Sequence, residues 1–211
     1  MVKRTELTDT QWWIEMKQGD EAALGILIKK HFNALLNYGY RFVKDEDFVK
    51  DCVQEIFIEL WQRREKISTP DSVKAYLLSS VRKKVLRENY RQQVFREEPG
   101  FGGVSDRTGA FDRSAEWVLI ENETVSELRE KVKRSINRLS KRQQEVLYLQ
   151  YFQNLSREEI SEIMNINLQS VSNLIQTAFS SFRNHWTALA LLAAFYHKII
   201  QTVCATDFFK I

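Results

Sequence analysis

Glycine and proline, the residues that interrupt helices, are scarce in this chain and gather in one place. The 211 residues include seven glycines and two prolines, and four of those glycines lie with Pro99 in the segment 96–109. On both sides of this segment apolar residues recur at helical spacing, without strand-like alternation. The sequence therefore predicts an all-α fold of two small helical domains, residues 8–95 and 114–186, joined by a flexible linker over 96–113.

The sequences near the two termini bear on the cellular location of the protein. The N-terminus is polar and lacks the apolar run of a signal peptide, so we expect a cytoplasmic protein. The C-terminal tail, 187–211, has an apolar stretch from Thr187 to Ile200. This stretch is shorter than the roughly 20 residues of a membrane span and is expected to be a docking helix. Cys52 and Cys204 lack metal-ligand spacing, so neither a disulfide framework nor a zinc site is expected.

The first domain is predicted to contain three long helices: one capped by Asp20, one over about 46–64 and one over about 72–92. The second has an apolar sector that must face the hydrophobic core, namely Val49, Cys52, Val53, Ile56, Phe57 and Leu60. Its opposite face sets an isoleucine among polar side chains beside a tryptophan, namely Asp51, Gln54, Glu55, Ile58 and Trp61. Such a mixture is typical of protein-binding patches, although a scattered surface isoleucine would give the same spacing.

The third helix carries a local excess of positive charge. Residues 73–96 hold seven basic residues against Glu88 alone, a net +6, whereas the whole chain has a formal net charge of +3. The predicted DNA surface on its outward side is Tyr76, Ser80, Lys83, Lys84, Arg87, Tyr90 and Arg91. Basic groups neutralise phosphates and tyrosines stack on unpaired bases, so this surface predicts contact with single-stranded or melting DNA. A solvated charged face is the alternative.

The second domain is predicted to begin with a long amphipathic helix over about 114–139, followed by three shorter helices. Their predicted caps are Ser140 with Gln143, Ser156 with Glu159, and Asn167. The last two helices, 156–164 and 168 to about 186, are joined by the tight connection 165–167. This is helix-turn-helix spacing, although generic three-helix packing would give the same apolar pattern.

The final helix of this pair can contact base edges in a major groove. Its outward side chains are amides and hydroxyls, which bind adenine and several other base edges: Gln169, Ser170, Ser172, Asn173, Gln176 and Thr177. Residues 168–182 contain no charge, so phosphate contacts must come from neighbours such as Arg157 and Arg183. We therefore expect the isolated domain to bind DNA weakly.

These segments resemble a known family. GDEAALGILIKKHF followed by DCVQEIFIELWQRREKI resembles region 2 of bacterial RNA polymerase sigma factors, and 139–186 resembles region 4. The D-x-x-Q-E-x-F-x-x-L-W string that begins at Asp51 is the most specific part. The short linker is similar to that of the extracytoplasmic-function (ECF) group of the sigma-70 family, and the lysine-rich, tyrosine-bearing character looks like versions found in Bacteroidetes.

The resemblance implies partners and roles. The Asp51, Gln54, Glu55 and Ile58 face would bind the β′ clamp helices of core RNA polymerase, and the β flap is a second implied polymerase contact. The third helix would contact the minus-ten promoter element, with the loop 67–73 capturing a flipped base. The helix-turn-helix would bind the minus-thirty-five element, and a membrane-tethered anti-sigma factor would hold the protein inactive. Relatives commonly have asparagine where Lys83 stands and aspartate near Arg87, so this chain departs from the family at positions that bear on base preference within the minus-ten element.

Two other functional classes are weighed against a sigma factor. An enzyme is not expected, because His31, His185 and His197 have no nucleophile or metal ligands spaced around them, and no phosphate-binding glycine loop exists. No cofactor, metal or small-molecule substrate is expected either. A stand-alone helix-turn-helix transcriptional regulator is the alternative, and it predicts a symmetric operator bound without polymerase. The uncharged recognition helix argues against it.

Overall fold

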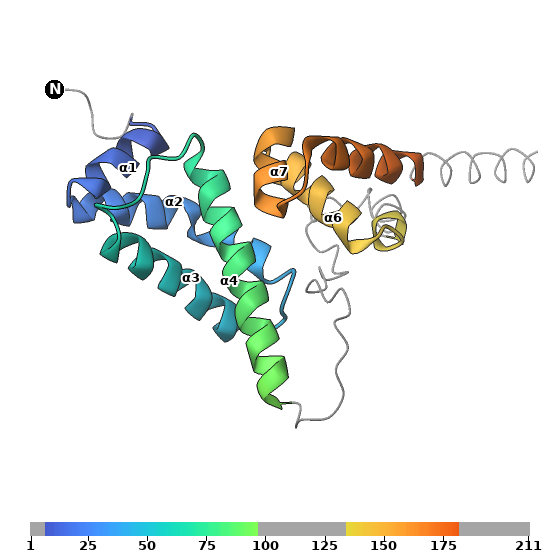
Figure 1. Cartoon of the computed structure of the whole chain (residues 1–211), viewed down its shortest axis with the longest axis horizontal. Coiled ribbons are helices and arrows are strands. Elements are labelled where there is room, and N and C mark those ends of the chain that lie inside the picture. Colours follow the sequence, from blue (N-terminus) through green and yellow to red (C-terminus); the bar gives the residue numbers. More distant parts are fainter. Residues whose placement is uncertain (1–6, 97–133, 182–211) are drawn as a thin grey trace, which may run out of the picture.

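The computed structural model describes residues 7–96 and 134–181, and every regular element in those two ranges is helical. The first range folds into a bundle of α1 (Asp9–Lys17), α2 (Glu21–Gly39), α3 (Glu46–Gln62) and α4 (Val73–Arg96) (Figure 1). The second range contains a short helix at 134–137, α6 (Lys141–Leu147), the π-helical turn η4 (Tyr148–Phe152), α7 (Arg157–Met164) and a helix over 168–181. The predicted all-α class is confirmed.

Side-chain caps start the helices where the sequence predicts them. Asp20 accepts hydrogen bonds from two backbone N–H groups of α2 at 2.8 and 3.2 Å. Ser140 and Ser156 each form a complete capping box with the residue three positions on. Asn167 accepts a hydrogen bond from the backbone N–H three residues on at 2.7 Å. Each cap satisfies N–H groups that the first turn leaves unpaired, which fixes the start of the helix.

The sequence prediction lacks α1, because its first helix begins only at Asp20. A signal for α1 is present, since Thr8 and Gln11 form a capping box at its start. The helix is nine residues long, which is too short for a clear apolar period, and its adjacent tryptophans obscure the pattern. Trp12, Trp13 and Met16 are nevertheless buried in the bundle.

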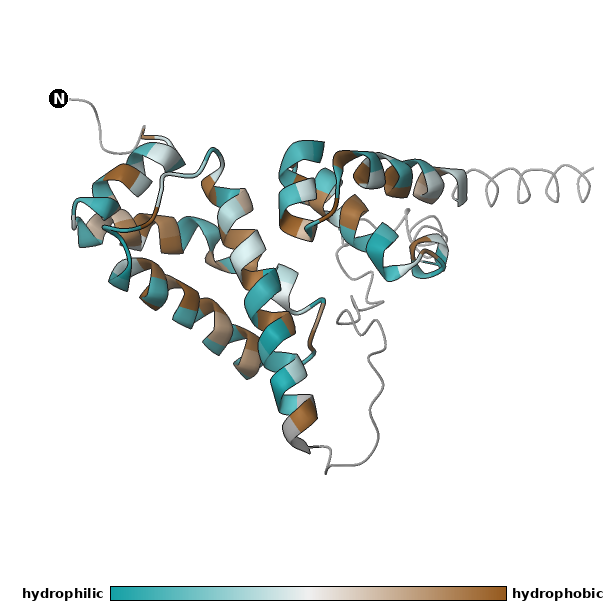
Figure 2. Ribbon diagram, in the orientation of Figure 1, coloured by the Kyte–Doolittle hydropathy of each residue, from teal (hydrophilic) through white to brown (hydrophobic). Residues whose placement is uncertain are grey.

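The predicted core face of α3 is confirmed. All six of its residues are buried, namely Val49, Cys52, Val53, Ile56, Phe57 and Leu60. This face packs against α2 and α4, so the polar side of α3 points outward (Figure 2). Burial raises the pKa of the Cys52 thiol to about 11, which keeps it protonated and unreactive.

The two helical regions are in direct contact. α7 packs along α4 on the side away from α3 (Figure 1), and one cluster of buried apolar side chains runs through both regions. The sequence prediction of two domains on a flexible linker contains no sign of this contact. It is formed by residues far apart in the chain, which no local pattern links.

Several predicted features lie outside the described residues. They are the linker beyond residue 96, the amphipathic helix up to residue 133, Arg183, and the tail 187–211 with Cys204. Within residues 7–96 and 134–181, none of the helices combines the length and the apolar character that a membrane span requires. The same residues include no group of histidine, cysteine or acidic side chains that could hold a metal ion.

Gly39 provides a stability test of the bundle, because α2 and α3 meet closely there. A Cβ atom at this position would overlap Val49 Cγ1 and lie 3.5 Å from Val81 Cγ1. Gly39→Ala is therefore expected to lower the free energy of unfolding by about 1–3 kcal/mol in urea titrations. The control is Gly25→Ala, whose Cβ would meet nothing within 4 Å and should stabilise α2 by up to about 1 kcal/mol. A Gly39→Ala chain as stable as the wild type would contradict this packing.

Candidate protein and nucleic-acid interfaces

The outer face of α3 presents the predicted protein-binding residues together. Asp51, Gln54 and Glu55 are exposed, and the Ile58 side chain is 55% exposed among them. Trp61 is half-buried at the end of this face, where the guanidinium carbon of Arg64 lies 4.4 Å from its ring centroid. These positions follow from the packing of α3, because burial of one side of a helix leaves the opposite side in water.

An apolar groove of about 430 Å³ runs beside this face, between α2 and α3. It is lined by Leu24, Ile28, Phe32, Gln54, Phe57, Ile58, Trp61 and Gln62. The wall on α2 was not predicted as part of a site, because apolar residues at helical spacing are indistinguishable from core residues in sequence. The groove enlarges the exposed apolar surface around Ile58 into a patch that is typical of protein-binding sites.

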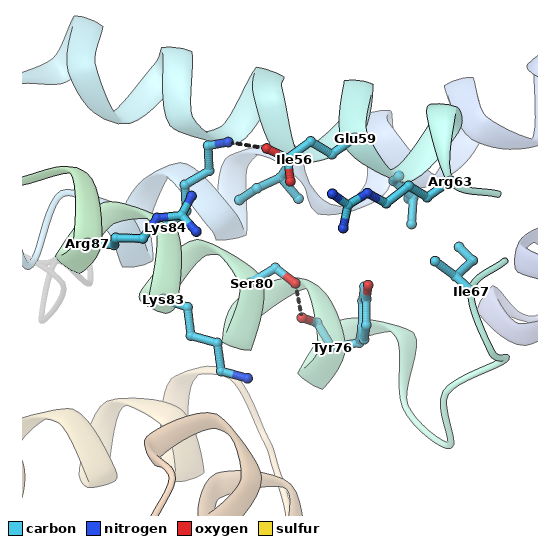
Figure 3. A pocket seen from close by; sticks show the side chains of 10 residues that line it. Ile56, Glu59, Arg63, Ile67, Tyr76, Ser80, Lys83, Lys84 and Arg87 are labelled. Atoms are coloured by element: carbon cyan, nitrogen blue, oxygen red, sulfur yellow. Dashed lines mark hydrogen bonds and ion pairs between the residues drawn. The ribbon is translucent and has the colours of Figure 1, made fainter.

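The predicted DNA surface lies along α4, and six of its seven residues are accessible. Tyr76, Lys83, Arg87, Tyr90 and Arg91 are exposed, and Ser80 is half-buried, donating a hydrogen bond to the Tyr76 carbonyl at 2.9 Å. Beside them a pocket of about 220 Å³ opens between α3 and α4 (Figure 3). Its lining combines the apolar Ile56, Leu60 and Ile67 with charged and hydroxyl side chains, including Glu59, Arg63 and Arg87.

Lys84 differs from the rest of the predicted DNA surface. Its side chain is only 7% exposed and its Nζ forms ion pairs with Glu55 at 2.8 Å and Glu59 at 2.6 Å. Burial disfavours its charge, but the hydrogen bonds to the two carboxylates outweigh burial and raise the pKa of Lys84. Figure 3 shows Lys84 directed toward α3, whereas Lys83 points away from it. The structure thus places Lys84 between the two helices and not on the exposed stripe.

Trp13 of α1 positions one end of the predicted DNA surface. This fully buried side chain makes an edge-to-face contact with Tyr76, with ring centroids 5.2 Å apart. Its Nε1–H also donates a hydrogen bond to the Ser68 carbonyl at 3.3 Å, within the loop that precedes α4. α1, which the sequence analysis does not predict, therefore fixes the position of Tyr76 and of the loop that contains Ser68, beside the pocket.

The helix-turn-helix pair has the geometry that the sequence predicts. Asn165 ends α7 in the left-handed conformation, with φ of 52°, and the helix 168–181 follows two residues later. Its outer face exposes Gln169, Asn173, Gln176 and Thr177, with Ser170 and Ser172 half-buried. Gln169 Nε2 donates to Asn173 Oδ1 at 3.0 Å, so these two amides hold each other in place. Arg157 is exposed at the start of α7.

Two domains of one protein family match the chain, in the order of these two helical regions. Sigma-70 region 2 matches residues 27–94, which extend from α2 through α4. Sigma-70 region 4 matches residues 129–180, which include α6, α7 and most of the helix 168–181.

Relatives named as sigma factors match more than two thirds of the chain. The ECF RNA polymerase sigma factor SigK of Mycobacterium tuberculosis (strain ATCC 25618 / H37Rv) is 23% identical over 145 residues, which cover 68% of this chain and 75% of that protein. RNA polymerase sigma factor YlaC of Bacillus subtilis (strain 168) is 24% identical over 166 residues, which cover 76% of this chain and 90% of that protein. The chain is an ECF sigma factor.

A sigma factor directs the initiation of transcription with core RNA polymerase at promoter DNA, and this is the function of the chain. Its fold agrees: the solved structure of CnrH in complex with the cytosolic domain of CnrY superposes with a TM-score of 0.53 at 18% identity, covering 85% of this chain and 97% of that one. A stand-alone helix-turn-helix regulator is not favoured, because this chain matches sigma-70 region 2 in addition to region 4, which contains the helix-turn-helix. α1 lies before the residues that match region 2.

Adjacent lysines of the sigma factor offer a matched test of this geometry. With core RNA polymerase and a minus-ten DNA strand, Lys83→Met is expected to weaken binding and reduce the slope of log affinity against log salt by about 0.7–0.9, the loss of one phosphate contact. Lys84→Met should leave that slope unchanged and lower the free energy of unfolding by about 1 kcal/mol, because its ion pairs to half-exposed carboxylates are lost. Fluorescence anisotropy at several salt concentrations and urea titrations measure the two effects. A reduced slope in Lys84→Met alone would contradict the geometry.

Proposed function

We propose that core RNA polymerase docks on the outer face of α3 and the adjoining groove through its β′ clamp helices. The observation that carries this proposal is the exposed Ile58 at the edge of an apolar groove of about 430 Å³, with Asp51, Gln54 and Glu55 around it. Such a surface suits an amphipathic helix that inserts apolar side chains and directs basic ones to the acidic rim. Docking there leaves the stripe on α4 free for DNA.

We propose that the exposed stripe on α4 binds the non-template strand of the minus-ten element. Lys83, Arg87 and Arg91 are placed to neutralise successive phosphates, and Tyr76 and Tyr90 offer ring faces for stacking. A flipped base would enter the pocket beside them, against Ile56 and Leu60. A pocket with an apolar floor and polar walls fits an unstacked base, which is flat and apolar on its faces and polar at its edge.

The minus-thirty-five element is assigned to the helix 168–181. Gln169, Asn173 and Gln176 are exposed amides that can bind adenine in the major groove. Arg157 supplies a phosphate contact, and Arg183, outside the described residues, is proposed for another. Because this face carries little charge, we propose that polymerase, partly through its β flap, contributes much of the affinity for DNA. The helix 168–181 then contributes the sequence preference.

An anti-sigma factor is the proposed inhibitor. The solved relative CnrH is bound to the cytosolic domain of CnrY, and a protein that covered the groove beside Ile58 in this chain would exclude polymerase. The proposed anti-sigma factor is tethered to the membrane and would bind the sigma factor on the cytoplasmic side, where polymerase and DNA also lie. The similarity to Bacteroidetes versions rests on the lysine-rich, tyrosine-bearing character of the sequence and stays a prediction.

Ile58→Asp tests the docking surface. A carboxylate at the centre of an apolar contact loses solvation without gaining a partner, so affinity for core RNA polymerase is expected to fall by at least about tenfold. Ile14→Asp is the control, because Ile14 is a similarly exposed isoleucine on α1, at 43%, away from the groove. Both are measured by titration of labelled sigma factor with core polymerase, after circular dichroism has shown equal folding. Equal affinities of the two variants would reject this docking surface.

Asn173→Ala and Arg157→Gln test the minus-thirty-five contact in reconstituted holoenzyme, on a promoter located from the transcripts that appear on overexpression. Asn173→Ala is expected to reduce discrimination between the cognate element and a base-substituted one by about 1–3 kcal/mol. Arg157→Gln should weaken binding to both sequences equally, because a phosphate contact carries no sequence information. Unchanged discrimination in Asn173→Ala would remove this residue from the base-contacting set.

A further inference from the structure

One end of the pocket between α3 and α4 is lined by residues of two different elements. Ile67 belongs to the loop that precedes α4, and Tyr76 belongs to the first turn of that helix. Figure 3 shows the Tyr76 hydroxyl directed toward α3, with Ile67 on the loop beside it. Ile67 is half-buried and Tyr76 is 38% exposed. The space between these two side chains therefore depends on what holds the loop against α4.

Trp13 of α1 contacts both elements at this end of the pocket. Its ring meets Tyr76 edge to face, at an interplanar angle of 77°. Its Nε1–H donates a hydrogen bond to the carbonyl of Ser68, the residue that directly follows Ile67. The Trp13 side chain is 0% exposed, so close packing leaves it one orientation. One rigid indole thus fixes the loop and the tyrosine relative to each other.

Other hydrogen bonds hold the two ends of this loop. At its start the backbone N–H of Lys66 donates to the Arg63 carbonyl at 2.8 Å. At its end Ser72 Oγ accepts a hydrogen bond from the backbone N–H three residues on at 3.3 Å. Between these points residues 68, 69 and 71 are exposed, and exposed loop segments with few buried contacts open readily. The hydrogen bond from Trp13 to Ser68 holds the loop in this middle part.

α1 is itself anchored, so that Trp13 is a fixed support. Asp9 Oδ1 accepts a hydrogen bond from Lys30 Nζ at 2.6 Å, and Asp9 Oδ2 lies 3.0 Å from His31 Nε2. Both partners lie on α2. Met16, one turn beyond Trp13, is also buried. A side chain that is locked by packing and by the anchoring of its own helix can set the position of the groups that it contacts.

Capture of an unpaired base depends on the position of the surfaces that it meets. Stacking of one base on an aromatic side chain contributes roughly 5- to 150-fold in affinity. A site whose supports shift by about 1 Å loses much of such a contribution. If the loop moves away from α4, the space between Ile67 and Tyr76 widens, and a base can no longer contact both.

We propose that Trp13 is a positioning residue for base capture, because its indole holds the loop 67–72 and Tyr76 at the separation that admits one unpaired base of the minus-ten strand. The proposal rests on the assignment, proposed above, of this pocket to a flipped base. Trp13 is fully buried, so it acts through Ser68 and Tyr76. It also lies before the residues that match region 2, so α1 contributes to the geometry of promoter recognition.

The experiment measures how much one base contributes to binding. Reconstituted holoenzyme is titrated with a single-stranded minus-ten oligonucleotide from a promoter located through the transcripts that appear on overexpression. An abasic site is moved along this strand, and the position at which the wild type loses most affinity marks the captured base. The ratio of the affinities for the intact and the abasic strand is the base preference, expected to be at least about fivefold. Phosphate contacts and polymerase docking cancel in this ratio, because both strands share them.

Trp13→Phe keeps an aromatic ring in the core and removes the N–H that holds the Ser68 carbonyl. It is expected to lower the base preference about two- to tenfold, the usual contribution of one hydrogen bond. The slope of log affinity against log salt should not change, because no phosphate contact is lost. Trp12→Phe is the matched control, since Trp12 is also buried on α1, at 4% exposed, and its side chain leaves the helix about 100° away. It should retain the base preference.

Amide hydrogen exchange in the free full-length chain tests the loop separately from DNA. Exchange over residues 67–72 should be faster in Trp13→Phe than in the wild type or in Trp12→Phe, because the loop opens more readily. Equal exchange in all three proteins would overturn the proposal. β-(3-Benzothienyl)alanine at position 13 places sulfur where the indole N–H stands at nearly unchanged volume, and it decides both measurements if Trp13→Phe fails to fold.

The outcomes distinguish the role of Trp13 from the assignment of the pocket. An undiminished base preference in Trp13→Phe, or an equal loss in Trp12→Phe, would overturn the role of Trp13, because the loss would then be absent or would follow the stability of the core. A wild type that loses affinity at no abasic position would reject the flipped-base pocket, and base capture by way of Trp13 with it. Faster loop exchange in that case would show that the indole holds the loop for another purpose.

Discussion

Burial of the apolar face of α3 fixes the direction of every other side chain on that helix. The face from Val49 to Leu60 packs against α2 and α4, so the residues around Ile58 are held in water. The same packing aligns α4, whose own buried side carries Leu77 and Val81 and whose basic stripe then points away from the core. The proposed polymerase surface and the proposed DNA surface are thus both consequences of one hydrophobic contact, on two sides of a small bundle.

Those two surfaces are joined by Lys84. Its ammonium bridges Glu55, which belongs to the proposed polymerase surface, and Glu59, which lines the pocket beside the DNA stripe. A polymerase group that competes for Glu55 would change the charge balance next to that pocket. The interregion contact has a comparable form, since Glu145 takes two donors from region 2. In both places a carboxylate connects helices whose outer surfaces are proposed to bind different partners.

The sequence alone predicted those structural features that depend on residues close together in the chain. Helical spacing on α3 separates core from surface, and the caps at Asp20, Ser140 and Ser156 mark helix starts, because each depends on residues within one turn. The α2 wall of the groove could not be distinguished from core, since both are apolar at the same spacing. The positions of Lys84 and Glu145 depend on partners 25 to 107 residues away, and charge alone does not indicate such pairing. The domains and site residues assigned from sequence otherwise stay predictions.

We propose that one sigma factor contacts a promoter at two points, through α4 and through the helix 168–181. Directed DNA cleavage tests this arrangement: an iron chelate is attached to Tyr90→Cys or to Gln176→Cys in a Cys204→Ser chain, and each protein is assembled with core polymerase on its promoter. We expect cleavage at the minus-ten element from Tyr90→Cys and at the minus-thirty-five element from Gln176→Cys, only when polymerase is present. Cleavage by both at one site, or equal cleavage without polymerase, would contradict it.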